Sequence, residues 1–389
     1  MISTKHISII SILLLASCID RINFDINLPY DLPIAIDGHI TNLPGPYQVT
    51  ISRSFDTQST EYLRTPVSAK QIILMDDLGN HEELTEVKAG LYETSATGMK
   101  GRIGGVYKIR IELFDDRIYE SLPDTILTPG TVDTLYHDFN LKLDQAGVEQ
   151  YGFDLKANST GNTGSETRYM WNMTATFKSI THPEKYDPDK PQGCYPIPEE
   201  FGKCNLVPLC TGLRNTAPRN SRIPIFKDVG PCECCTCWYK LTNNAPILSD
   251  ALLAAKANYN ALLIYRIPLD QWMFMFKVHT EVTQSTLTLN SFRFFKSITE
   301  QKNAIGSLFQ PITGKIPNTF IQIAGTATPI NGIFYAAGVD SKSMYITRDD
   351  VPKQSLIPEV NFNIRGNGWF SCLELFPDAT MTKPAFWVD

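Results

Sequence analysis

Four cysteines occupy six consecutive positions, Cys232, Cys234, Cys235 and Cys237, and this is the densest group of reactive side chains in the sequence. The spacing contains two interleaved Cys-x-x-Cys pairs, which can wrap a soft metal ion as thiolates or exchange disulfides in a redox reaction. It also suits the centre of a disulfide-bonded loop. No histidine lies nearby and no loop separates the two pairs, so the spacing differs from that of common structural zinc sites. The compartment in which the chain folds decides between these chemistries.

The first eighteen residues indicate that compartment. Lys5 precedes a mostly apolar run over residues 7–16, and ten helical residues at about 1.5 Å each span only half of a bilayer core. This pattern predicts a signal peptide over residues 1–17. The run ends in Leu-Ala-Ser-Cys, which resembles the lipobox of bacterial lipoproteins. We therefore expect fatty acylation (palmitate) of Cys18, a membrane anchor at that residue and a tether over 18–29; an ordinary signal peptide is the alternative.

Export makes the remaining cysteines candidates for disulfides. Without Cys18 the count is eight, and an even number outside the cytosol is typical of a disulfide framework. Seven of the eight lie in a segment rich in Pro and Gly, which predicts a disulfide-bonded insertion over 187–240. We expect one bridge from Cys372 to the 232–237 group, no metal site and no cofactor. A zinc or copper cage is the alternative. The disulfide candidates are Cys194, Cys204, Cys210, Cys232, Cys234, Cys235, Cys237 and Cys372.

Other catalytic patterns are missing from the sequence. No two histidines of the mature chain have the spacing of a metalloprotease, and the Gly-x-Ser-x-Gly elbow of serine hydrolases does not occur. His279 shares one face of a predicted strand with Lys277 and Glu281, which favours a solvated face over a pocket. The net charge of −6 and the lack of a long basic run argue against nucleic-acid binding. The sequence thus predicts a protein that is not an enzyme.

Alternating apolar and polar residues predict that the fold is mainly β. Residues 30–125 contain several short strands bounded by turns, and we expect an N-terminal β-sandwich there, which resembles transthyretin-like or carboxypeptidase-regulatory-like modules. A larger β-rich domain follows over 132–389. Within it, alternation over 270–282 predicts a strand, and a helical stripe over 285–309 predicts one helix beginning at Ser285 or Thr286.

The segment 122–135 has the Pro and Gly residues of a linker between the two domains. It contains Asp-Thr-Ile and Asp-Thr-Leu, which resemble the O-glycosylation motif of certain bacteria. Because a linker is accessible, Thr125 and Thr134 are candidate glycosylation sites.

Several stretches in this order resemble a family of outer-membrane lipoproteins of unknown function from Bacteroidota, often encoded beside TonB-dependent transporter genes. They are the lipobox cysteine, IAIDGHIT, PYQVTISRS, PVSAKQIILMDDLG, GLYET, GGVYKIRI, RYMW, the Cys-Cys and Trp near 234–238, SFRFFKSITEQ, GSLFQP, GIFYAAG and KPAFW. The resemblance implies a lipid-anchored outer-membrane protein, on either face, that works as a binding or accessory subunit beside a TonB-dependent transporter. A structural surface lipoprotein and an envelope hydrolase acting on glycans or peptides remain alternatives.

Overall fold

The computed structural model describes most of the chain after the expected tether. The described residues are 33–53, 65–143, 147, 149–162, 168–181, 212–216, 225–243, 245–249, 258–270, 272–304, 316–327, 329–352 and 372–389. The predicted signal peptide and Cys18 lie outside them. So do most of the insertion and the last part of the predicted helix, residues 305–309. No helix of the described part is long and apolar enough to cross a membrane.

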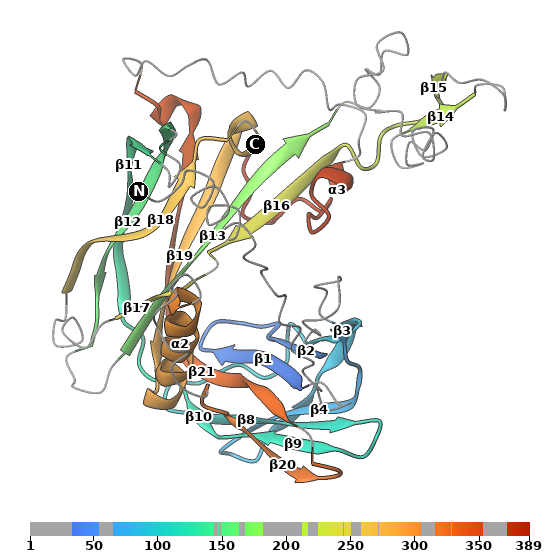
Figure 1. The fold of residues 1–389 in the computed structure, drawn as a ribbon, viewed down its shortest axis with the longest axis vertical. Helices are drawn as coiled ribbons and strands as arrows, with labels where there is room; N and C mark the ends of the chain where they lie inside the picture. Colours follow the sequence, from blue (N-terminus) through green and yellow to red (C-terminus); the bar gives the residue numbers. More distant parts are fainter. Residues whose placement is uncertain are drawn as a thin grey trace, which may run out of the picture.

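The N-terminal strands form two sheets that pack face to face (Figure 1). Their alternating burial follows the sequence pattern, as in β1 and β8, and confirms the predicted mainly β fold and the sandwich. The strands of this part are β1 (Ile34–Thr41), β2 (Gln48–Arg53), β3 (Thr65–Pro66), β4 (Ala69–Asp76), β5 (His81–Glu83), β6 (Thr85–Lys88), β7 (Leu91–Glu93), β8 (Val106–Leu113), β9 (Ile118–Ser121) and β10 (Asp124–Thr125).

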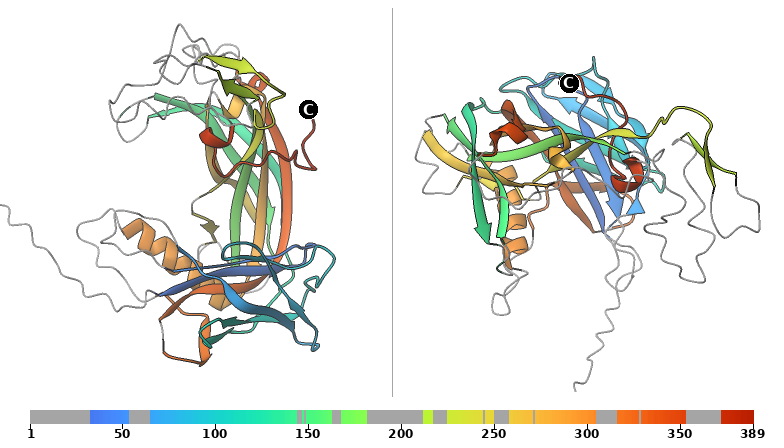
Figure 2. Two further views of the ribbon diagram at one scale, coloured as in Figure 1. Left: turned by 90° about the vertical axis from the view of Figure 1, so that its right-hand side faces the viewer. Right: turned by 90° about the horizontal axis from the view of Figure 1, so that it is seen from above.

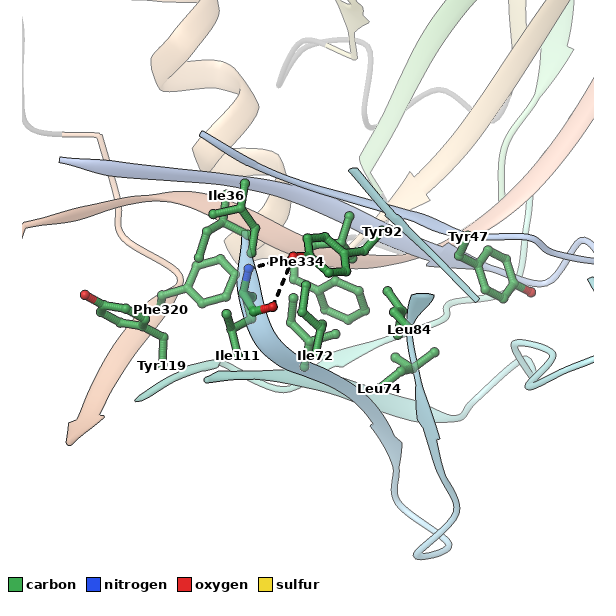
Figure 3. Packing of buried hydrophobic residues seen from close by; sticks show 14 of the residues in the cluster. Ile36, Tyr47, Ile72, Leu74, Leu84, Tyr92, Ile111, Tyr119, Phe320 and Phe334 are labelled. Carbon is green, nitrogen blue, oxygen red and sulfur yellow. Dashed lines mark hydrogen bonds between the residues drawn. The ribbon is translucent and has the colours of Figure 1, made fainter. Parts of the chain in front are cut away.

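Buried aliphatic and aromatic side chains from both sheets fill the sandwich (Figure 3). The Tyr92 hydroxyl is buried among them, where an unpaired polar group would be costly. It accepts a hydrogen bond from the Ala69 N–H (2.6 Å) and donates one to the Ala69 carbonyl (3.2 Å), so that the ring joins β7 to the start of β4. Phe320 and Phe334 belong to the same core, although they lie about 200 residues further along the chain than most of the other core residues.

The C-terminal part completes this sandwich, which the boundary at residue 125 did not anticipate. Strand β20 (Phe320–Ala324) pairs with β9, and the first half of β21 (Ile330–Thr347) pairs in parallel with β1. The second half of β21 pairs with β19, so one sheet runs through both parts in the order β16-β13-β19-β21-β1-β2-β7-β6. This single long strand joins the two parts.

A curled half-barrel forms the second part (Figure 2). A three-stranded sheet, β11-β12-β18, faces the β16-β13-β19-β21 section of the long sheet across an aromatic core that includes Phe153, Trp171 and Phe274. Its strands are β11 (Thr131–Leu143), β12 (Glu149–Thr160), β13 (Arg168–Ile180), β16 (Thr236–Thr242), β17 (Ile247–Leu248), β18 (Asn258–Pro268) and β19 (Lys277–Leu287). Beside it lie β14 (Leu213–Asn215), β15 (Phe226–Asp228), the 3-10 turns η5 (Met273–Met275) and η6 (Arg348–Asp350), and helix α3 (Cys372–Leu375).

Two element predictions in this part are wrong at their edges. The described residues of 270–276 form no strand: Met273–Met275 are the η5 turn, and the Asp270 carboxylate before it accepts the N–H groups of Trp272 and Met273. The predicted helix is α2 (Leu289–Ala304), which begins after residue 288, since 285–287 continue β19 between β13 and β21. Strand pairing on both sides therefore outweighs the capping residues at Ser285 and Thr286.

Candidate functional site

The cysteine cluster is oxidised. Cys232 pairs with Cys235 (Cα–Cα 5.5 Å) and Cys237 with Cys372 (Cα–Cα 5.9 Å), which confirms the disulfide prediction and the bridge from Cys372. Cys234 is disulfide-bonded as well. Because a disulfide sulfur is no thiolate ligand, these four cysteines cannot form the metal cage that their spacing left open. Cys194, Cys204 and Cys210 lie outside the described residues.

The Cys237–Cys372 bridge fixes one end of a segment that we call the C-terminal strap, residues 372–389. Near the bridge, the ring of Phe376 packs in the aromatic core against Phe177 and Tyr239. The strap then crosses the edge strand β16, where Thr380 and Trp238 exchange two backbone hydrogen bonds (2.8 and 3.0 Å). In Figure 1, α3 lies beside β16. The strap therefore starts on the inner side of the sheet and passes over its edge.

The last residues of the strap lie on the outer face of the sheet, the face turned away from the aromatic core. Residues 177, 278 and 346 point into that core, so their neighbours Lys178, His279 and Tyr345 point outward. Phe386 stacks on the His279 ring with centroids 4.2 Å apart. His279 is only 6 % exposed, so our prediction that it lies on a solvated face is wrong. Burial lowers the pKa of His279, although the charge of Glu281 opposes this effect.

Charged groups hold the end of the strap. The Asp389 carboxylate accepts hydrogen bonds from the ammonium groups of Lys383 (2.6 Å) and Lys178 (3.0 Å). These bonds lower the pKa of Asp389 to about 2, so it is ionised at neutral pH. No sequence motif indicated the contacts between the strap and the outer face, because the residues that make them come from β13, β19, β21 and the strap.

A buried carboxylate holds the junction of the two parts. Asp124 accepts hydrogen bonds from the hydroxyls of Thr288 and Ser291 at the start of α2 (both 2.6 Å). It also accepts the backbone N–H groups of Ala336 and Thr125 (both 3.0 Å). The segment 122–135 is thus no free linker: Asp124–Thr125 forms strand β10, which pairs with β8. Asp124 looked like part of a glycosylation motif, yet its carboxylate is fully engaged in the fold.

The two candidate glycosylation sites differ in access. Thr125 is half-buried, and its neighbours Asp124 and Ile126 are buried. Thr134 is exposed on β11, where a register shift after Val132 pairs it with Asn158, the neighbour of the core residue Ala157. Thr134 therefore keeps the access that a modifying enzyme needs, whereas Thr125 would need local opening of the junction.

A second histidine lies beside the junction. His39 on β1 and Tyr335 on β21 are paired in the parallel register and stack with ring centroids 5.4 Å apart, and Phe295 of α2 covers Tyr335. Burial lowers the pKa of His39, and Asp37 opposes this shift. Burial also raises the pKa of Tyr335. The aromatic contacts suit packing of α2 on the sheet, and the pair gives the junction a neutral imidazole at pH 7.

Comparison with protein families identifies the family of this chain. Residues 21–343 match the family described as Domain of unknown function (DUF4249). The chain belongs to the DUF4249 family. The match takes in the sandwich, the half-barrel, α2 and most of β21, whereas the strap lies beyond the matched residues of this DUF4249 protein. No curated protein matches the sequence significantly.

One further charged cluster of the DUF4249 region yields a prediction for pH. Asp154 on β12 is buried on the outer side of its sheet, where it accepts hydrogen bonds from Lys142 (2.7 Å), Asn140 (2.7 Å) and Arg266 (2.9 Å). Burial alone would raise the pKa of Asp154, but these bonds outweigh it and lower the pKa to about 2. The folded state therefore holds the proton less tightly than the unfolded chain.

Because the folded pKa is depressed, the stability contributed by Asp154 is present above about pH 4 and lost as the pH falls toward 2. We expect Asp154→Asn to be less stable at neutral pH and to lose less stability than the natural chain between these values. Urea unfolding at a series of pH values measures both effects. Asp138→Asn is the matched control, since Asp138 pairs with Lys156 on the adjacent strand but is half exposed. Equal acid sensitivity of the natural chain and Asp154→Asn would contradict the assignment.

Proposed function

We propose that this DUF4249 protein is a lipid-anchored cell-envelope protein that serves as a non-catalytic binding or accessory subunit of a TonB-dependent uptake system in the outer membrane of Bacteroidota. The observation that carries the proposal is the oxidised state of the cysteines at 232–237 and 372. Disulfides persist where thiols meet an oxidant, outside the cytosol. The Leu-Ala-Ser-Cys sequence at residues 15–18 supports the same location and supplies the anchor.

The engagement of the buried acids favours binding over catalysis. A general acid or base needs a proton that it can exchange with a substrate. Asp124 and Asp154 instead direct their carboxylates to donors of their own fold, and the imidazole of His279 lies beneath the strap. These groups position strands and segments of the chain. The outer-membrane location and the transporter partner rest on the family resemblance.

Metabolic labelling with palmitate tests the anchor. We expect label and membrane association in the natural chain and loss of both in Cys18→Ala, because Cys18 is the residue proposed to carry the acyl chains. Asn27→Ala, a change in the same tether, is the control and should keep the label. Palmitate label on Cys18→Ala, or recovery of the natural protein in the soluble fraction, would rule out acylation of Cys18.

Affinity purification from native membranes of the source bacterium tests the partner. We expect an outer-membrane transporter to co-purify in stable stoichiometry with the natural chain. Recovery of the anchored protein alone, after mild crosslinking, would favour the structural surface lipoprotein.

A further inference from the structure

The outer face under the strap makes contacts of two kinds, to backbone and to side chains. The Tyr345 hydroxyl donates a hydrogen bond to the Phe386 carbonyl (2.8 Å) and accepts one from the Val388 N–H (3.1 Å). Trp238 pairs with Thr380 through both of its backbone groups. Contacts of this kind bind the backbone of a segment whatever its side chains are. The pairing at Trp238 resembles the addition of a peptide strand at a sheet edge, whereas residues 384–387 form a turn in which the Trp387 N–H donates to the Pro384 carbonyl (2.9 Å).

The same face also distinguishes side chains. His279 stacks on Phe386, and the Lys277 ammonium lies 5.8 Å from the centre of the Trp387 ring and 4.6 Å from that of Tyr345. Trp387 is only 3 % exposed. A cation above aromatic faces and a buried indole favour two adjacent aromatic residues in the bound segment.

Lys178 extends this recognition to a carboxylate. Its ammonium group binds Asp389 and lies 5.3 Å from the Phe276 ring and 5.8 Å from the Trp238 ring. The face therefore recognises residue 389 by its negative charge. The face thus contacts the side chains of Phe386, Trp387 and Asp389, whereas Val388 is held through its N–H and its side chain is exposed.

We propose that this outer face of β16, β13, β19 and β21 is a peptide-recognition site for segments that carry two adjacent aromatic residues at the end of a turn and an acidic residue two positions after the second aromatic. Residues 380–389 of the chain itself fill the site. The bridge at Cys372 keeps the segment at high local concentration beside the site, which makes its docking intramolecular. The inference does not depend on the function proposed above.

A labelled synthetic peptide with the sequence of residues 380–389 tests the site in the full chain. In the natural chain the site is occupied, so the peptide should bind poorly. In the full-length variant Phe386→Ala/Trp387→Ala the chain's own segment loses both aromatic contacts, and we expect the peptide to bind at least about tenfold more tightly. Adding Tyr345→Phe to this variant should weaken peptide binding about tenfold, because two backbone hydrogen bonds are lost.

One control and two outcomes decide the proposal. A peptide of the same composition in scrambled order should bind neither protein. Equal binding of the natural peptide to both proteins, or binding to neither, overturns the proposal. A dimer of the natural chain that forms without added peptide, by exchange of residues 380–389 between two copies, would support the proposal. In such a dimer the same face binds the same segment of a second copy.

Hydrogen exchange in the otherwise natural chain provides a readout that does not depend on the double variant. Tyr345→Phe should raise the exchange rate over residues 380–389, with the largest change at Val388, since its N–H loses its acceptor. Tyr265→Phe, on the three-stranded sheet, is the matched control and should leave these rates unchanged. Unchanged exchange over 380–389 in Tyr345→Phe overturns the assignment of Tyr345 to the site.

Discussion

Replacing both Cys237 and Cys372 with alanine is expected to lower the free energy of unfolding by about 3–5 kcal/mol. The bridge closes a loop with a sequence separation of 135 residues, and the chain-entropy relation gives roughly 5 kcal/mol for a loop of that size. Both cysteines are fully buried, so alanine also leaves a small cavity beside the aromatic core. Urea unfolding of the purified, non-reduced proteins measures the loss.

The second bridge of the cluster is the matched control for this prediction. Cys232 and Cys235 have a sequence separation of 3, for which the same relation gives only about 1.6 kcal/mol. We therefore expect Cys232→Ala/Cys235→Ala to be clearly more stable than Cys237→Ala/Cys372→Ala. Equal losses in the two double variants would mean that the long bridge does not constrain the unfolded chain, and that the strap is held by its noncovalent contacts alone.

The cysteine chemistry could be predicted from the sequence because it depends on few residues. The predicted export and an even count of cysteines were sufficient to predict disulfides, and the isolation of Cys372 was sufficient to suggest its bridge. Strands of the sandwich followed in the same way, since alternation in β1 and β8 reports one buried face directly. Local patterns were therefore sufficient to predict the strands of the sandwich and the disulfide bonds.

The long-range pairing could not be predicted in this way. Nothing in the sequence of β21 indicates that its first half pairs in parallel with β1, about 300 residues away, while its second half pairs with β19. Gly338 hints at the crossing, because a Cβ there would collide with the Leu127 carbonyl, but the reason is visible only once both segments are placed. The strap contacts are likewise nonlocal: Tyr345 and Phe386 lie 41 positions apart. Sites built from such pairs require the tertiary structure.

The buried carboxylate of Asp124 gives the second large prediction. We expect Asp124→Ala to cost about 3–5 kcal/mol of unfolding free energy, because four donors lose their acceptor together. Two of these donors, Thr288 and Ser291, lie where β19 ends and α2 begins, and a third, Ala336, lies on β21. The change should therefore raise hydrogen exchange in the first turn of α2 as well as lower the midpoint of urea unfolding.

Asp133→Ala tests whether burial is the cause. Asp133 holds the same place in the second Asp-Thr motif and also accepts two side-chain hydrogen bonds, from Thr131 and Thr160, but these are exposed. Water can replace an exposed acceptor, so this variant should lose less than about 1 kcal/mol. If Asp124→Ala were as mild as Asp133→Ala, the junction would not depend on the carboxylate, and packing of α2 and β21 alone would have to join the sandwich to the half-barrel. If only Asp124→Ala loosens the first turn of α2, then the Asp124 carboxylate holds the two parts of the molecule together, although Asp124 is also the first residue of a candidate glycosylation motif.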